Sequence, residues 1–152
     1  MKLSGKSKLT ALQNEERYVF HGSGLRLEEL DPRQAYTVRD GVTIADGLPA
    51  IFASQLVDYA IFMALINPQT CRLGSRSRCG YVDGRLIFGA SRHALDQLND
   101  STRGFVHVFE RVDFEFRGGT EWMCLKSIKP SSIVEICRAD FCEEIAEIPH
   151  GL

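Results

Sequence analysis

The sequence predicts an α+β fold in which strands outnumber helices. From Gly104 onward, short β-branched and aromatic runs alternate with turn residues, which is typical of consecutive strands. Earlier, residues 56–66 are apolar nearly all round, as in a helix buried on every side. Asp83-Gly84 lies between two apolar runs and is a strong signal for a β-hairpin.

Composition narrows the class of protein. The 152 residues are expected to form a single domain, residues 1–152, with a hydrophobic core of its own. The net charge of -2 argues against a general attraction to nucleic acid or membranes. Five cysteines without a CxxC pair argue against a zinc site and a fully paired secreted framework. No apolar run is long enough to span a membrane, and the polar N-terminus does not resemble a signal peptide. We expect a cytoplasmic protein with reduced cysteines, no metal and no membrane partner.

The N-terminal third predicts one helix, one strand and one long loop. Residues 4–16 are polar, with two leucines at helical spacing, and predict a short amphipathic helix or a frayed leader. Residues 18–20 predict a buried strand. Residues 25–47 hold three Asp-Pro or Asp-Gly turn signals and predict a long loop with at most short strands, which in a compact domain is often a binding element.

The end of the first strand is a candidate site. Gly22 and Gly24 break the strand, so His21 is presented beside backbone that a ligand can approach without a Cβ in the way. Its imidazole offers two nitrogen positions for hydrogen bonds. The alternative is an ordinary strand-to-turn junction with a surface histidine.

The middle of the chain predicts a strand followed by the buried helix. Residues 49–53 read as a second buried strand, and Ser54 is placed to cap the helix over 56–66. Asn67-Pro68 should end that helix, because proline cannot continue it. Residues 71–79 hold three arginines among serine and glycine and predict a basic loop.

The remaining elements follow the same rules. Residues 80–82 and 85–88 flank the Asp83-Gly84 turn. Ser91 is placed to cap a short helix that runs through Leu98. The last expected strands are residues 105–109, 112–116, 121–128 and 133–137.

Three segments, in this order, resemble the ADP-ribosyltransferase superfamily, especially its poly(ADP-ribose) polymerase and rifampin ADP-ribosyltransferase branch. His21-Gly22-Ser23 ends one strand, residues 50–54 lead into a helix containing Tyr59-Ala60-Ile61-Phe62, and Glu121 opens the strand 121–125. The resemblance covers roughly residues 17–66 and 104–137. It implies a split pair of β-sheets with an NAD cleft between them.

The resemblance also implies a reaction, in which mono-ADP-ribose moves from NAD, as substrate, to an unknown acceptor that is a protein, a nucleic acid or a small molecule. This glycosyltransferase chemistry builds oxocarbenium character on the ribose, so a carboxylate is needed nearby. By resemblance, Glu121 bonds the ribose 2′-hydroxyl and stabilises that charge, and His21 orients a ribose hydroxyl. Gly22 bonds the nicotinamide carboxamide through its backbone, and Ser23 braces the turn. The alternative for Glu121 is a solvated carboxylate at a strand edge.

The chain departs from the family pattern at several positions. Ile51 aligns with a tyrosine that usually stacks on the nicotinamide. Tyr59 falls where the polymerases carry a serine that bonds the carboxamide, and Phe62 falls at a second stacking tyrosine. Phe62 is therefore either a stacking ring without a hydroxyl or a core residue. Gly119 replaces the acidic or amide residue of arginine-modifying toxins, which disfavours an arginine acceptor.

Two other functions fit the same residues. A non-catalytic NAD or ADP-ribose binding module is favoured by the loss of the tyrosine at Ile51. An RNA 2′-phosphotransferase shares the family fold; it would place arginines on phosphates and would not require Glu121. Arg72, Arg76 and Arg78 belong either to a solvated loop or to a contact with phosphate or acceptor, because the arginine fork matches phosphate geometry.

Overall fold

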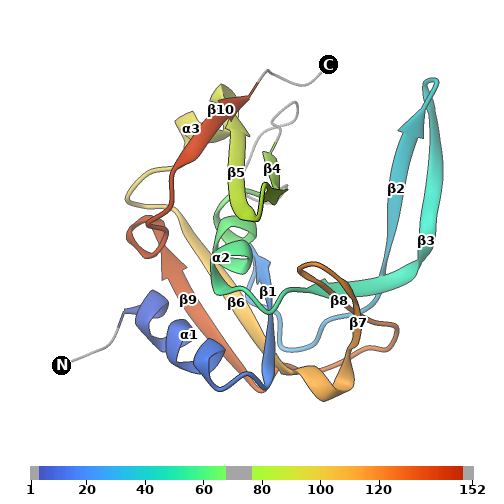
Figure 1. Ribbon diagram of the computed structural model, residues 1–152, viewed down its shortest axis with the longest axis horizontal. Helices are drawn as coiled ribbons and strands as arrows, with labels where there is room; N and C mark the ends of the chain where they lie inside the picture. The colour runs from blue at the N-terminus through green and yellow to red at the C-terminus, as the bar shows by residue number, and fades with distance from the viewer. Residues whose placement is uncertain (1–3, 68–76, 149–152) are drawn as a thin grey trace.

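The computed structural model describes residues 4–67 and 77–148, with only the backbone given for residues 35–39 and 46. These residues form ten strands and three α-helices, so the predicted strand-rich α+β class is confirmed (Figure 1). They form three sheets, one more than the pair expected from the resemblance.

The first sheet carries the segment that ends at His21. It is antiparallel, with β6 in the middle, and comprises β1 (Tyr18–Ser23), β6 (Arg103–Glu110) and β9 (Ser132–Cys137). Helix α1 (Gly5–Asn14) packs against β9, and helix α2 (Val57–Leu65) packs against β1 and β6. The N-terminal segment is thus an ordered helix, in which Leu9 is buried as the leucine spacing predicts.

The other two sheets lie to either side of α2 in Figure 1. The second is antiparallel, in the order β2 (Arg33–Arg39), β3 (Val42–Ala53), β8 (Glu121–Cys124) and β7 (Glu115–Gly118). The third has the order β10 (Ile145–Ile148), β5 (Arg85–Ser91) and β4 (Ser77–Val82), with α3 (Arg92–Gln97) following β5. The Asp83-Gly84 hairpin is confirmed, because both turn residues have positive φ, at 50° and 78°.

Two apolar clusters hold the sheets together. The larger surrounds α2, where the Phe62 ring lies 5.1 Å from the Phe88 ring and 5.7 Å from the Phe141 ring. The smaller lies between the first and second sheets and includes Val19, Ile51 and Phe109, which are all buried. Helix α2 is thus buried nearly all round, as its sequence predicts.

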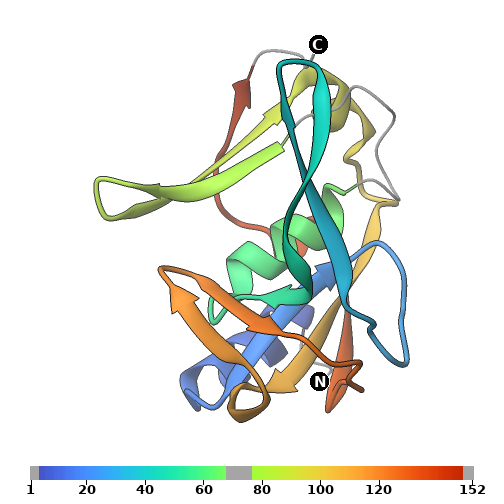
Figure 2. The same cartoon turned by 90° about the vertical axis from the view of Figure 1, so that its right-hand side faces the viewer.

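The prediction of a long loop over residues 25–47 is wrong, because most of this range belongs to two paired strands. Strands β2 and β3 form a hairpin arm that extends away from the body, and Figure 2 shows the arm crossing in front of the body. Asp40 and Gly41 have φ of 51° and 77°, so they form the turn of this arm. The turn signals that suggested a loop therefore include a two-residue hairpin turn.

Several boundaries also differ from expectation. Ser54 does not cap α2: the hydroxyl accepts from the Leu56 amide at 3.1 Å, and Gln13 Oε1 accepts from the Val57 amide at 2.7 Å. Residues 111–113 form a 3₁₀ turn instead of the start of a strand, with Val112 exposed. Strand β8 ends at Cys124, and β10 was not anticipated. Among the described residues, none of the helices has the length and apolarity required to cross a bilayer.

Candidate active site

Two adjoining cavities meet at the end of β1. One, about 220 Å³, is named here the Glu121 cavity, and the other, about 410 Å³, the Arg33 cavity, each after a charged residue in its wall. Four residues line both cavities: His21, Gly22, Phe52 and Met63. The strand end that the sequence singled out is therefore the shared wall of two neighbouring cavities.

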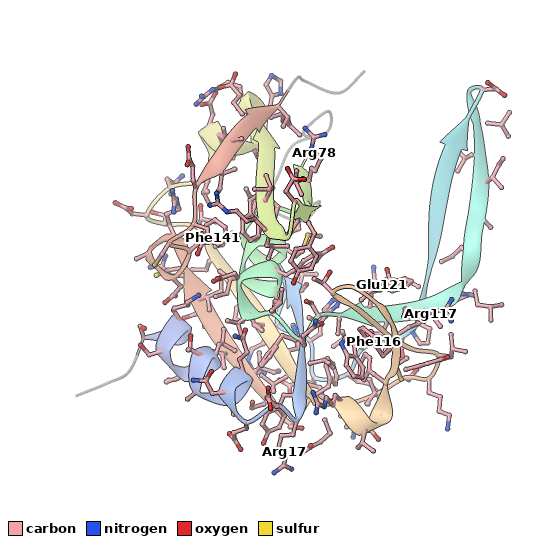
Figure 3. All side chains as sticks on the ribbon, in the orientation of Figure 1. Arg17, Arg78, Phe116, Arg117, Glu121 and Phe141 are labelled. Carbon is pink, nitrogen blue, oxygen red and sulfur yellow. The ribbon has the colours of Figure 1, made fainter. Side chains whose placement is uncertain are left out.

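The Glu121 cavity brings together four predicted site residues. His21 and Gly22 come from β1, Tyr59 from α2 and Glu121 from the start of β8. Glu121 lies beside the β7–β8 turn in Figure 3. Segments that are distant in the chain thus contribute to the wall of one cavity.

His21 is held as a neutral acceptor. Its Nδ1 lies 2.6 Å from the Phe52 carbonyl oxygen, and a carbonyl only accepts, so Nδ1 carries the proton. Burial lowers the pKa of His21, with a further lowering by Arg33, although the Phe52 hydrogen bond opposes both. The neutral ring keeps a lone pair on Nε2, which suits a hydroxyl donor such as that of ribose.

Gly22 offers its backbone to the same space. Phe20 exchanges two backbone hydrogen bonds with Ser54, at 2.7 and 2.9 Å, on the side of β1 away from β6. Backbone groups two residues apart point to the same side of a strand, so the N–H and C=O of Gly22 also point away from β6. A ligand carboxamide, which has both a donor and an acceptor, matches that pair.

Ser23 belongs to the turn and not to the Glu121 cavity. It is buried and lines the Arg33 cavity, and its hydroxyl accepts from the Leu25 amide at 3.1 Å. This contact braces the chain where it leaves β1, the role that the resemblance implies for Ser23.

Glu121 is placed by the turn before it. Gly118 and Gly119 have φ of 101° and 59°, a conformation that favours glycine. Gln55, just before α2, donates from Nε2 to the Gly119 carbonyl at 3.0 Å and accepts from Trp122 Nε1 at 3.0 Å. Gln55 thereby ties the entry of α2 to both sides of Glu121, a role that sequence reasoning missed.

The Glu121 carboxylate is accessible. Glu121 is exposed, and no hydrogen bond or ion pair joins its side chain to another of the described residues. The pKa of Tyr59 is raised, first by burial and then by the nearby Cys79 and Glu121, so its phenol remains a neutral donor. The cavity therefore combines a carboxylate with a hydroxyl, a neutral imidazole and an open backbone.

Two predicted contact residues lie elsewhere. Phe62 is 1% exposed and packs in the core, so the core alternative describes it in this structure. Ile51 is 3% exposed, and it borders only the Arg33 cavity. Its neighbour Phe52 is 36% exposed and lines both cavities. Side chains alternate between the two faces of a strand, so Phe52 points outward when Ile51 points inward. This alternation was the signal in the sequence by which Phe52 could have been chosen in place of Ile51.

The arginines are distributed differently from the expectation. Arg72 and Arg76 lie outside the described residues, and Arg78 is an exposed residue of β4 that lines neither cavity. Arg33 lines the larger cavity and is close enough to His21 to lower its pKa. The sequence analysis missed Arg33 because a single arginine after Asp31-Pro32 belongs to no recognisable motif.

Comparisons with protein-family models, with curated proteins and with solved structures found no match.

A buried histidine next to the site predicts a dependence of stability on pH. The pKa of His107, which is 0% exposed, is lowered to about 4, chiefly by burial. Because an unfolded histidine titrates near 6.5, unfolding takes up a proton between these values. The free energy of unfolding should therefore have its full value above about pH 6.5 and decrease as the pH falls toward about 4. Protonation of His107 in the unfolded state should account for a loss on the order of 3 kcal/mol.

Urea unfolding across that range checks this expectation. His107→Gln should reduce the loss of stability between about pH 7 and about pH 4.5. His93→Gln is the matched control, because His93 is exposed on α3 and lines neither cavity. An identical pH profile in wild type and His107→Gln would contradict the lowered pKa.

Proposed function

We propose that this protein transfers mono-ADP-ribose from NAD to an acceptor, on an ADP-ribosyltransferase type of fold. The observation that carries the proposal is the single cavity lined by His21, Gly22, Tyr59 and Glu121. These residues occupy the positions that the family resemblance assigns to NAD, and they come from three separate elements. The acceptor remains open among a protein, a nucleic acid and a small molecule.

The Glu121 cavity suits the nicotinamide end of NAD. The N–H and C=O of Gly22 bond the carboxamide, and the neutral Tyr59 hydroxyl is a further donor. His21 accepts from a ribose hydroxyl through Nε2, since Nδ1 is engaged with Phe52. Glu121 then lies near the ribose carbon that becomes electron-poor as nicotinamide leaves, and its charge stabilises the oxocarbenium-like state.

The Arg33 cavity suits the remainder of the dinucleotide. It adjoins the first cavity through His21 and Gly22, and it is the larger of the two. Arg33 supplies a cation for the pyrophosphate, because a guanidinium binds phosphate oxygens through paired hydrogen bonds. Leucines in its wall, Leu25, Leu27 and Leu30, offer apolar surface to a base.

A second candidate is an NAD or ADP-ribose binding module without turnover. Burial of Ile51, where the family has a stacking tyrosine, favours it. Phe52 offers an exposed ring at the junction of the cavities instead, although it has no hydroxyl. Release of nicotinamide from NAD separates the two functions, because only the enzyme produces it.

Added NAD is expected to raise the melting temperature. A ligand at about 100 times its dissociation constant stabilises the folded state by about 2.7 kcal/mol. Thermal unfolding with and without NAD measures the shift, which His21→Ala should reduce and the control His93→Ala should retain. A well-folded sample whose melting temperature does not change in millimolar NAD would contradict both candidate functions.

A further inference from the structure

His107 lies directly behind the proposed site and has a partner at each ring nitrogen. It sits on the central strand β6, opposite His21 of β1 in the antiparallel register, and it is fully buried. The Leu27 amide donates to Nε2 at 3.0 Å, and Nδ1 lies 3.3 Å from the His21 carbonyl oxygen. Neither cavity is lined by His107, so it does not face a ligand.

The two contacts define the protonation state of the ring. An amide only donates, so Nε2 must carry a lone pair, and the proton of the neutral ring then sits on Nδ1 and faces the His21 carbonyl. Protonation at Nε2 would remove the acceptor for Leu27. Charge on the ring is opposed by burial and by the nearby His21 and Arg26, and its partner on β9 is the apolar Ile133.

The contact with Leu27 is the central one of three attachments. The chain between β1 and β2 is held at its start by Ser23, whose hydroxyl accepts from the Leu25 amide. At its end, Leu30 exchanges two backbone hydrogen bonds with Ile128, both at 2.9 Å. Between them, His107 is the partner of Leu27. Leu25, Leu27 and Leu30 all line the Arg33 cavity, so these attachments hold one of its walls.

We propose that His107 is a positioning residue, which fastens the wall formed by residues 24–30 to the strand that presents His21. The wall is thereby formed before a ligand arrives, so no binding free energy is spent on ordering it. The identity of the ligand rests on the function proposed above, whereas the attachment itself does not. An apolar residue at 107 would fill the same space but leave the buried Leu27 amide without an acceptor.

Two near-isosteric replacements separate the contacts of His107. Gln places an acceptor near the Nε2 position, and Asn places a donor near the Nδ1 position. For His107→Asn, we expect the Kd of ADP-ribose to rise about tenfold, the value of one lost hydrogen bond. For His107→Gln, we expect a Kd within about twofold of wild type. The Kd of nicotinamide, which needs only the Glu121 cavity, should change in neither variant.

A general destabilisation would not produce this pattern, because it would affect Asn and Gln variants, and both ligands, alike. Equal effects of the two replacements on ADP-ribose would therefore overturn the proposal. An unchanged Kd in His107→Asn would overturn it as well.

Wild-type protein provides a test that does not depend on any ligand. Nitrogen-15 spectra of the His107 ring should show a proton on Nδ1 and none on Nε2, and the Leu27 amide should exchange slowly with solvent. A proton on Nε2, or exchange of Leu27 as fast as at an exposed loop, would overturn the attachment. If these results hold but wild type binds neither ADP-ribose nor NAD, the proposed function fails and the attachment stands.

Discussion

Glu121→Gln is expected to lower the rate of nicotinamide release from NAD by about 10²–10³-fold, while the Kd of NAD stays within about twofold of wild type. The amide keeps the size of the side chain and one acceptor oxygen. It removes the negative charge, which matters most when positive charge develops on the ribose. The loss should therefore appear in the chemical step, which single-turnover release of nicotinamide measures.

Glu115→Gln is the matched control for this replacement. Glu115 lies on β7 of the same hairpin and is exposed, and its one ion pair with a described residue is with Arg117, at 3.8 Å. An exposed ion pair of this kind contributes about 0–1 kcal/mol to stability. If Glu121→Gln released nicotinamide at the wild-type rate, the catalytic role of Glu121 would be contradicted. An equal loss of rate in Glu121→Gln and Glu115→Gln would indicate damage to the hairpin.

The parts of the fold that the sequence predicted are those with strong local signals. Helix α2 was predicted because residues 56–66 are apolar nearly all round, and the β4–β5 hairpin because Asp83-Gly84 accepts positive φ. The β2–β3 arm was missed, although Asp40-Gly41 makes the same kind of turn. Val42 and Ile44 of β3 are 58% and 46% exposed, so these apolar residues of the arm lack the burial on one face by which a strand is recognised.

The sequence predicted those residues of the candidate site that belong to short motifs. His21, Gly22 and Glu121 were predicted from short motifs that resemble those of the ADP-ribosyltransferase superfamily, and they line one cavity. Gln55 and His107 were missed because their roles depend on hydrogen bonds to Gly119 and Leu27, which no local pattern encodes. Residues that hold a site in place are defined by tertiary contacts, whereas residues that bind a ligand more often belong to a motif.

Gly22→Ala is expected to destabilise the protein by about 3 kcal/mol and to abolish NAD binding. A Cβ at position 22 would lie 1.9 Å from the Ala60 carbonyl oxygen and 2.7 Å from the Ala64 nitrogen. Both are backbone atoms of α2, which cannot rotate aside as a flexible side chain can. The helix would have to move as a unit, and it would carry Tyr59 away from the strand end that lines the same cavity.

Gly80→Ala provides the matched comparison, because Gly80 also lies in a strand, and its Cβ would meet no heavy atom within 4 Å. Gly104→Ala tests the same cause from the neighbouring strand β6, where the Cβ would lie 2.4 Å from the Ala64 carbonyl oxygen. Urea unfolding should show large losses for Gly22→Ala and Gly104→Ala, and a change within about 0.5 kcal/mol for Gly80→Ala. Similar stability of all three variants would show that α2 does not press on β1 and β6 as closely as these distances require.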